Sequence, residues 1–183
     1  MRWITLCLFL MNITCMAQVV QNFSLTDVST GQYVALADLS SRPGVAIIFT
    51  STDCPYDNYY LSRIQNLIEA YQSRIAILLI NSNRDESMEQ MKKYVEQQNL
   101  TAPYLWDLEQ KAMPALGVSK TPQCFLLESS GGKFTVVYKG AIDDNAQSAS
   151  AVNQSYLKDA IDQLLAKKKI ETRETRPVGC SIQ

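Results

Sequence analysis

The sequence predicts an α/β domain in which a mixed central β-sheet is flanked by helices. Two continuous apolar runs, residues 45–50 (VAIIFT) and 75–80 (IAILLI), have the composition of strands buried on both faces. Between them, residues 55–73 carry apolar side chains every three or four positions, the spacing of an amphipathic helix. Two strands joined in this way run parallel, and a later hairpin adds antiparallel strands to the same sheet.

Short elements before the first buried strand predict an N-terminal β-hairpin extension. Residues 21–25 and 33–36 have strand-like patterns on either side of a Ser-Thr-Gly turn. The first buried strand follows Pro43, and the first long helix begins at Pro55. Proline suits the first turn of a helix, because its missing amide hydrogen has no partner there in any case.

The second half of the chain alternates helices and strands. Ser87 and Gln90 form a capping-box pattern that starts a helix over residues 87–98. The other predicted elements are an extended piece at 104–106, a short helix at 108–116 broken by Pro114, strands at 123–127 and 134–139 around a Ser-Ser-Gly-Gly turn, and a helix at 155–169. A polar, flexible C-terminal tail is expected at 170–183.

The beginning of the chain reads as an export signal. Arg2 provides a positive start, residues 3–13 are mostly apolar but too short to span a bilayer, and Ala17 is small enough to precede a cleavage site. We therefore expect a signal peptide at 1–17, a domain at 18–169 and the tail at 170–183. The protein is expected to be exported, either periplasmic or secreted. An uncleaved membrane anchor is the alternative, and it is the only membrane association expected.

Composition excludes several classes of function. The chain has 183 residues, of which 46% are hydrophobic, enough for one globular domain. Its formal net charge of −1 disfavours a nucleic-acid partner. Histidine is absent, which excludes Ser-His and Cys-His catalytic pairs and every His-ligated metal. No metal or other cofactor is expected.

Cys54 is the residue expected to carry chemistry. It follows the first buried strand and precedes Pro55, so it lies at or near the N-cap of the helix. Unpaired amide groups and the helix dipole favour a thiolate at this position, which makes a nucleophile without any histidine. A buried structural cysteine is the alternative. Cys124 and Cys180 are the other cysteines outside the signal segment, and an odd number leaves one without an intramolecular partner.

A second feature is Thr121-Pro122, directly before the strand at 123–127. Bonds that precede proline are the usual place for a cis peptide, and proline can open a strand. A cis-proline loop facing Cys54 would offer backbone groups to an incoming peptide or thiol. Tyr56 is expected to line a groove there, or to pack in the core with its hydroxyl in water.

Together these residues resemble the thioredoxin-like superfamily, and within it the redoxin branch of alkyl hydroperoxide reductase/thiol-specific antioxidant proteins. The resemblance rests on the strand VAIIFT, on Cys54 five residues after Phe49, and on Thr121-Pro122 before a hairpin; it covers roughly residues 20–182. It implies a thioredoxin-like fold and an antioxidant or redox-homeostasis role. It also implies protein or small-molecule disulfides or peroxides as substrates, and an external thiol as reductant.

Two departures from the family patterns bear on the mechanism. Where thioredoxin has the second cysteine of Cys-x-x-Cys, this chain has Asp57, whose like charge would oppose a thiolate. Peroxiredoxins carry Pro-x-x-x-Thr/Ser-x-x-Cys. Ser51 supplies the hydroxyl, which is expected to contact the substrate, but Ile47 stands at the proline position. A peroxidatic cysteine also has a cation nearby, and the candidates are Arg63, Arg74 and Arg84.

We expect an exported thiol oxidoreductase in which Cys54 attacks disulfides in preference to peroxides, because the peroxidatic pattern is incomplete. Cys124, Cys180 or an external thiol would resolve the resulting mixed disulfide or sulfenic acid. Strand alternation places Cys124 on the side of Pro122 that faces Cys54; alternatively it is a small core hydrophobe, or it forms a disulfide with Cys180. The second class of function is a catalytically weak thioredoxin-fold module that binds client proteins.

Overall fold

The structure is a computed structural model, and it describes residues 18–183. The predicted signal peptide at 1–17 lies outside the described residues. Within residues 18–183, none of the helices combines the length and the apolar composition needed to cross a membrane.

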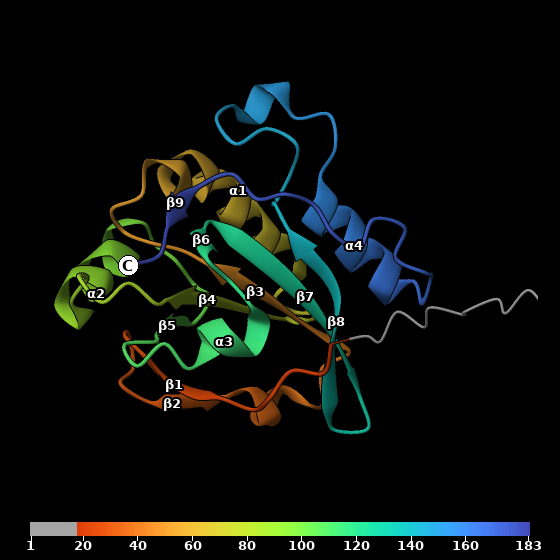
Figure 1. The fold of residues 1–183 in the computed structure, drawn as a ribbon, viewed down its shortest axis with the longest axis horizontal. Helices are drawn as coiled ribbons and strands as arrows, with labels where there is room; N and C mark the ends of the chain where they lie inside the picture. The colour runs from red at the N-terminus through yellow and green to blue at the C-terminus, as the bar shows by residue number, and fades with distance from the viewer. Residues whose placement is uncertain (1–17) are drawn as a thin grey trace, which may run out of the picture.

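A seven-stranded sheet forms the centre of the molecule, in the order β2-β1-β5-β4-β3-β7-β8 (Figure 1). Its strands are β1 (Ser24–Asp27), β2 (Tyr33–Ala35), β3 (Gly44–Phe49), β4 (Ala76–Asn81), β5 (Tyr104–Trp106), β7 (Gln123–Ser130) and β8 (Lys133–Gly140). The pairs β3–β4 and β4–β5 are parallel, and the others are antiparallel. The predicted mixed sheet, with its N-terminal hairpin, is confirmed.

Helices cover both faces of this sheet. They are α1 (Pro55–Tyr71), α2 (Met88–Gln97), α3 (Ala112–Leu116) and α4 (Tyr156–Leu165), with 3-10 turns at Leu36–Leu39 and Ala149–Ala151. Because side chains alternate along a strand, β3 contributes to two cores. Ile48 packs in the cluster that α1, α2 and α4 cover, whereas Ile47 and Phe49 pack in the cluster that α3 covers.

Local signals in the sequence explain where several elements begin and end. Ser87 caps α2, and its side chain and that of Gln90 form the predicted capping box. Gly131 and Gly132 both have positive φ, as a two-residue hairpin turn requires, and they join β7 to β8. The last helix is shorter than predicted: α4 ends at Leu165, so the lysines at 167–169 follow it.

The C-terminal tail, predicted to be flexible, is instead packed along the domain. Ile170 is buried, and Thr175 donates its amide hydrogen to the Lys139 carbonyl. Further along the tail, strand β9 (Cys180–Ser181) pairs antiparallel with β6 (Lys120–Thr121). A Cβ at Gly140 would lie 2.3 Å from the Thr175 carbonyl oxygen, so glycine is needed for this close approach. The tail thereby reaches the end of the sheet where β3 stops.

Candidate functional site

Cys54 and Cys180 form a disulfide at the start of α1. Cys54 is the N-cap of the helix, as the position of Pro55 predicts, and its backbone is extended. The Cα atoms of the two cysteines are 6.0 Å apart although 126 residues separate them in the sequence. Of the two candidate partner cysteines, Cys124 and Cys180, the structure therefore brings Cys180 to Cys54.

The Thr121-Pro122 loop lies against this disulfide. Its peptide bond is cis, and the carbonyl oxygen of Thr121 is 3.5 Å from Cys54 Sγ. Thr121 is also the residue opposite Cys180 in the β6–β9 pair. The residue before Pro122 thus contacts both cysteines, and its backbone is placed to hold an extended segment beside Cys54.

A shallow pocket of about 180 Å³ opens beside the disulfide. It is lined by Ser51, Asp53, Cys54, Asn83, Asp85, Glu86, Thr121, Cys180, Ser181 and Gln183. None of the three candidate cations lines it, and Arg63 forms an ion pair with Asp143 instead, at 2.6 Å. Among the described residues, no group of three or more Cys, Asp or Glu side chains is placed to hold a metal ion.

Glu86 fixes the loop that precedes Cys54. Its buried carboxylate accepts hydrogen bonds from Ser51 Oγ, from Thr52 N and Oγ1, and from the side-chain amides of Asn81 and Asn83. The Ser51 hydroxyl, predicted to face a substrate, is therefore engaged by Glu86. Sequence reasoning missed Glu86; the available signal was a carboxylate shortly after the carboxyl end of a buried parallel strand.

Asp57 occupies the position of the second cysteine in thioredoxin and is buried beneath the loop. Its Oδ2 accepts a 2.7 Å hydrogen bond from Thr121 Oγ1, while Oδ1 is buried and has no partner among the described residues. Burial raises the pKa of Asp57 to about 7, although the hydrogen bond from Thr121 lowers it in part. At and below neutral pH, much of this carboxyl is uncharged and does not oppose a Cys54 thiolate.

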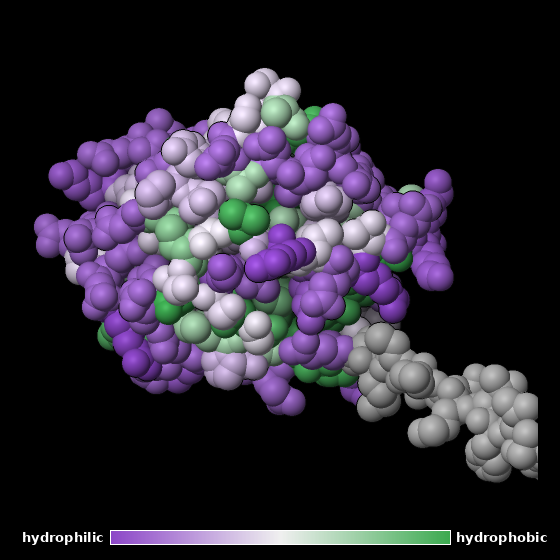
Figure 2. All heavy atoms as spheres, turned by 45° about the horizontal axis from the view of Figure 1, so that its top comes forward, coloured by the Kyte–Doolittle hydropathy of each residue, from purple (hydrophilic) through white to green (hydrophobic). Residues whose placement is uncertain are grey.

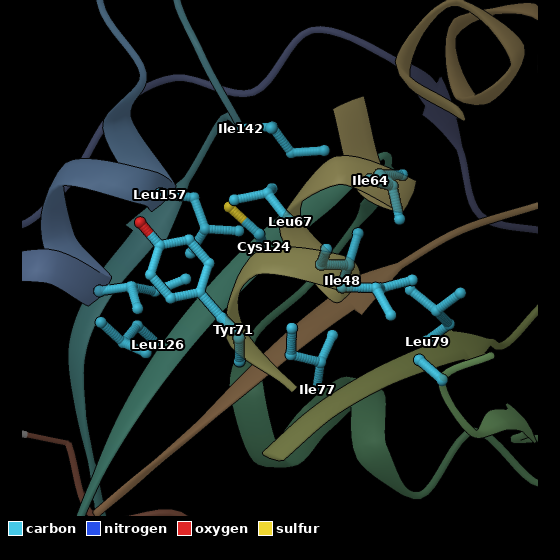
Figure 3. Packing of buried hydrophobic residues seen from close by; sticks show 14 of the residues in the cluster. Ile48, Ile64, Leu67, Tyr71, Ile77, Leu79, Cys124, Leu126, Ile142 and Leu157 are labelled. Atoms are coloured by element: carbon cyan, nitrogen blue, oxygen red, sulfur yellow. The ribbon is translucent and has the colours of Figure 1, made fainter. Parts of the chain in front are cut away.

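Cys124 does not face Cys54, contrary to the expectation from strand alternation. It lies opposite Ile48 on β3 and packs in the core beneath α1 and α4, near Leu67 and Leu157 (Figure 3). Its Sγ lies 3.3 Å from the carbonyl oxygens of Gly140 and Ala141, and burial raises the pKa of this thiol well above its usual range. Cys124 is a free cysteine that serves as a small core hydrophobe, and the alternative disulfide with Cys180 is not formed.

Tyr56 does not line the pocket beside the disulfide. It is half-buried, and its ring contacts that of Tyr59 edge-to-face, with the centroids 6.2 Å apart. The next tyrosine, Tyr60, is buried and donates its hydroxyl hydrogen to Asp143.

Figure 2, turned so that the top of Figure 1 comes forward, shows mostly hydrophilic side chains, with apolar ones in small separate groups.

Comparisons with known proteins give a family and a fold. The model of the AhpC/TSA family matches residues 16–141. No curated protein matches the chain. A hypothetical protein of Sinorhizobium meliloti superposes with a TM-score of 0.82 at 26% identity, over 93% of this chain and 95% of its own. An uncharacterized conserved protein of Geobacillus kaustophilus gives 0.83 at 26% identity, over 94% and 93%. A secreted disulfide oxidoreductase of Mycobacterium tuberculosis gives 0.57 at 16% identity, over 79% and 95%.

The family match covers Cys54 and the Thr121-Pro122 loop but ends before Cys180. Cys54 and the proline loop thus come from the shared part of the fold, and the cysteine bonded to Cys54 comes from the segment beyond it. This arrangement supports a redox function on a thioredoxin-like fold, as predicted from the resemblance. The chain belongs to the AhpC/TSA family, in the redoxin branch of the thioredoxin-like superfamily.

Proposed function

We propose that the protein is a thiol–disulfide oxidoreductase whose redox-active pair is Cys54 and Cys180. One observation carries the proposal: these two cysteines are joined at the N-terminus of α1, beside the cis-proline loop. When the disulfide opens, the free amide groups and the dipole of α1 stabilise a thiolate on Cys54. Cys180 then supplies the second sulfur, which Asp57 cannot supply.

The exchange needs only the two protein sulfurs and the substrate. The Cys54 thiolate attacks one sulfur of a substrate disulfide, a Cys54–substrate bond forms, and the other substrate sulfur leaves as a thiolate. The Cys180 thiolate then attacks Cys54 Sγ, the Cys54–Cys180 bond forms again, and the first substrate sulfur leaves. Two electrons pass from the protein to the substrate, and an external dithiol returns the protein to its dithiol form by the same chemistry.

Disulfides are favoured over peroxides as substrates because the surroundings of Cys54 lack two peroxidatic features. The hydroxyl of Ser51 is engaged by Glu86, and the pocket beside the disulfide is lined by carboxylates and by no Lys or Arg. A cation near Cys54 would stabilise the thiolate that attacks a peroxide. Peroxide reduction would end in the same disulfide, so the two activities are separated by assay.

A client-binding module without turnover is the second candidate, and the burial of Cys54 favours it. Only 4% of this residue is exposed. A disulfide held closed in this setting would keep Cys54 from attacking a substrate disulfide, so the protein would bind clients without turnover.

The two candidates differ in the redox behaviour of the Cys54–Cys180 bond. We would equilibrate the purified protein in dithiothreitol redox buffers, quantify the bond by alkylation and mass spectrometry, and assay insulin and hydroperoxide reduction with an external dithiol. We expect a reversible two-electron transition, with insulin reduced faster than hydroperoxide. A bond that stays closed, together with no turnover of either substrate, would overturn the oxidoreductase and leave the binding module.

Export is part of the proposal. It is supported by the signal pattern at 1–17 and by the occurrence of this fold in a secreted disulfide oxidoreductase of Mycobacterium tuberculosis. Disulfide exchange between secreted proteins suits an oxidising compartment. The test is the N-terminal mass of the protein recovered from periplasmic or culture fractions: cleavage after Ala17 is expected, and an intact cytosolic chain would contradict it.

A further inference from the structure

The end of the chain occupies a strand edge next to Cys54 as an extended segment. Cys180 lies opposite Thr121, Ile182 donates its amide hydrogen to the Ser119 carbonyl at 3.2 Å, and Gln183 donates to Asn83 Oδ1 at 3.0 Å. These backbone contacts do not depend on the side chains of the seated segment. We call this surface, formed by residues 119–121 and Asn83, the β6 edge.

The β6 edge tolerates almost no side chain at the residue before the disulfide-bonded cysteine. A Cβ at Gly179 would lie 2.1 Å from the Thr121 carbonyl oxygen, 2.7 Å from the Thr121 carbonyl carbon and 3.0 Å from Pro122 N. All three are backbone atoms of the Thr121-Pro122 loop that lies against Cys54, so they cannot rotate away as the end of a side chain would. Any segment seated here in the same manner needs glycine at this position.

The edge also contacts one apolar side chain on the other side of the cysteine. Ile182, two residues after Cys180, is partly buried and packs against the hydrophobic cluster that α3 covers. The segment seated on the edge therefore has a recognisable pattern: glycine, cysteine, any residue, apolar residue.

A substrate must take the place of this segment during exchange. In the mixed disulfide, a substrate sulfur is bonded to Cys54 where Cys180 Sγ is bonded in the structure. Departure of β9 leaves the backbone groups of β6 without partners, and an extended substrate segment satisfies them by strand addition.

We propose that the β6 edge selects protein substrates whose reactive cysteine directly follows a glycine and is followed, two residues later, by an apolar residue. This inference rests on the proposed oxidoreductase function. The C-terminal segment of the protein then acts as a built-in competitor with the same pattern as the substrate.

The test compares symmetrical disulfides of three synthetic peptides in steady-state reduction by the full chain with an external dithiol. The first has the sequence Pro-Val-Gly-Cys-Ser-Ile-Gln, the second has alanine in place of glycine, and the third has aspartate in place of isoleucine. We expect kcat/KM to fall by about tenfold or more for the alanine peptide, which corresponds to about 1.4 kcal/mol, and by a smaller factor for the aspartate peptide. Insulin serves as the reference substrate.

The outcomes separate the two proposals. Equal kcat/KM for the glycine and alanine peptides, or turnover of insulin without turnover of any peptide, would overturn selection by the β6 edge while the oxidoreductase stands. No turnover of insulin or peptides would remove the oxidoreductase and this inference with it.

A variant of the protein itself tests the contact between residue 179 and the Thr121 backbone. Gly179→Ala is expected to slow closure of the Cys54–Cys180 bond by about tenfold or more, because its Cβ meets the Thr121 backbone. Val178→Ala, at an exposed neighbouring residue, is the matched control and should close at the wild-type rate. Gly179→Ala closing as fast as the control would show that the edge accepts a side chain, against the proposal.

Discussion

Cys54 and Cys124 are both buried, yet the protein surrounds them in opposite ways. Cys54 lies five residues after the end of β3, at a helix N-terminus, with a disulfide bond and a carboxylate-lined pocket beside it. Cys124 lies inside β7, with no part of the residue exposed and apolar side chains packed around it. Burial alone therefore does not distinguish the cysteine that we propose to be reactive from the one that packs in the core; the helix terminus and the bonding partner of the sulfur do.

The largest expected effect comes from replacing each cysteine in turn and comparing the activities of the two variants. Cys54→Ser should lower insulin reduction by about ten-thousandfold or more, as loss of a nucleophile does in other enzymes. Cys124→Ala should leave kcat/KM within about twofold, because its sulfur faces away from the pocket. Comparable losses in the two variants, measured under the same dithiol concentration, would erase the distinction between the two sites.

Opening the disulfide should affect stability next most strongly. A cross-link that closes a loop of 126 residues is expected to stabilise the fold by about 5 kcal/mol through the entropy of the unfolded chain. Urea unfolding of the oxidised and reduced protein measures this difference, and Cys54→Ser should unfold identically with and without reductant. A reductant-sensitive Cys54→Ser variant would show that a different disulfide carries the effect.

Asp57 adds a second difference between the two sites. Among residues 18–183, it is the one buried carboxyl with an oxygen that has no hydrogen-bond partner, and it lies beside Cys54. Its pKa is raised from 3.8 to about 7 in the folded protein, so the charged form is disfavoured by folding. The cost is absent below about pH 4, grows between pH 4 and 7 and is complete above pH 7. Asp57→Asn should therefore match the wild type at pH 4 and exceed its unfolding free energy by about 4 kcal/mol at pH 8. An advantage that does not grow with pH would contradict this assignment.

The smallest expected effect concerns packing around Cys124. Cys124→Ala removes a fully buried sulfur from the core and should cost about 1–2 kcal/mol of unfolding free energy, measured by urea titration of the oxidised protein. In the reduced native protein, iodoacetamide should label Cys54 and Cys180 but leave Cys124 unmodified. Rapid labelling of Cys124 without unfolding would place its sulfur nearer to solvent than the core packing allows.

Much of the fold follows from local patterns. The apolar runs at 45–50 and 75–80 predict β3 and β4, and Ser87 with Gln90 predicts the start of α2. The position of Cys54 before Pro55 predicts its place at the N-cap of α1. These features can be predicted from the sequence because the periodicity of apolar residues, helix capping and the geometry of proline depend on residues that are close in sequence.

The sequence predicted the position of Cys54 and the proline loop beside it, but not the residues that surround them. Glu86 and Asp57 acquire their roles from burial and from donors on other segments, and sequence spacing does not report either property. Two alternatives were open for Cys124, a side chain facing Cys54 or a small core hydrophobe. The pairing of β7 with β3 places it in the core beneath α1 and α4. One residue of register decides the face of the sheet on which a side chain lies.

The sequence by itself determined the fold class, the family and the position of Cys54 at a helix start, since these depend on short-range patterns. Only the tertiary structure decided which cysteine completes the pair. The tail packs back through contacts such as Thr175 against Gly140, and these place Cys180 opposite Thr121. A disulfide between residues 126 positions apart is set by the distance between backbones in the folded chain, and no local pattern encodes that distance.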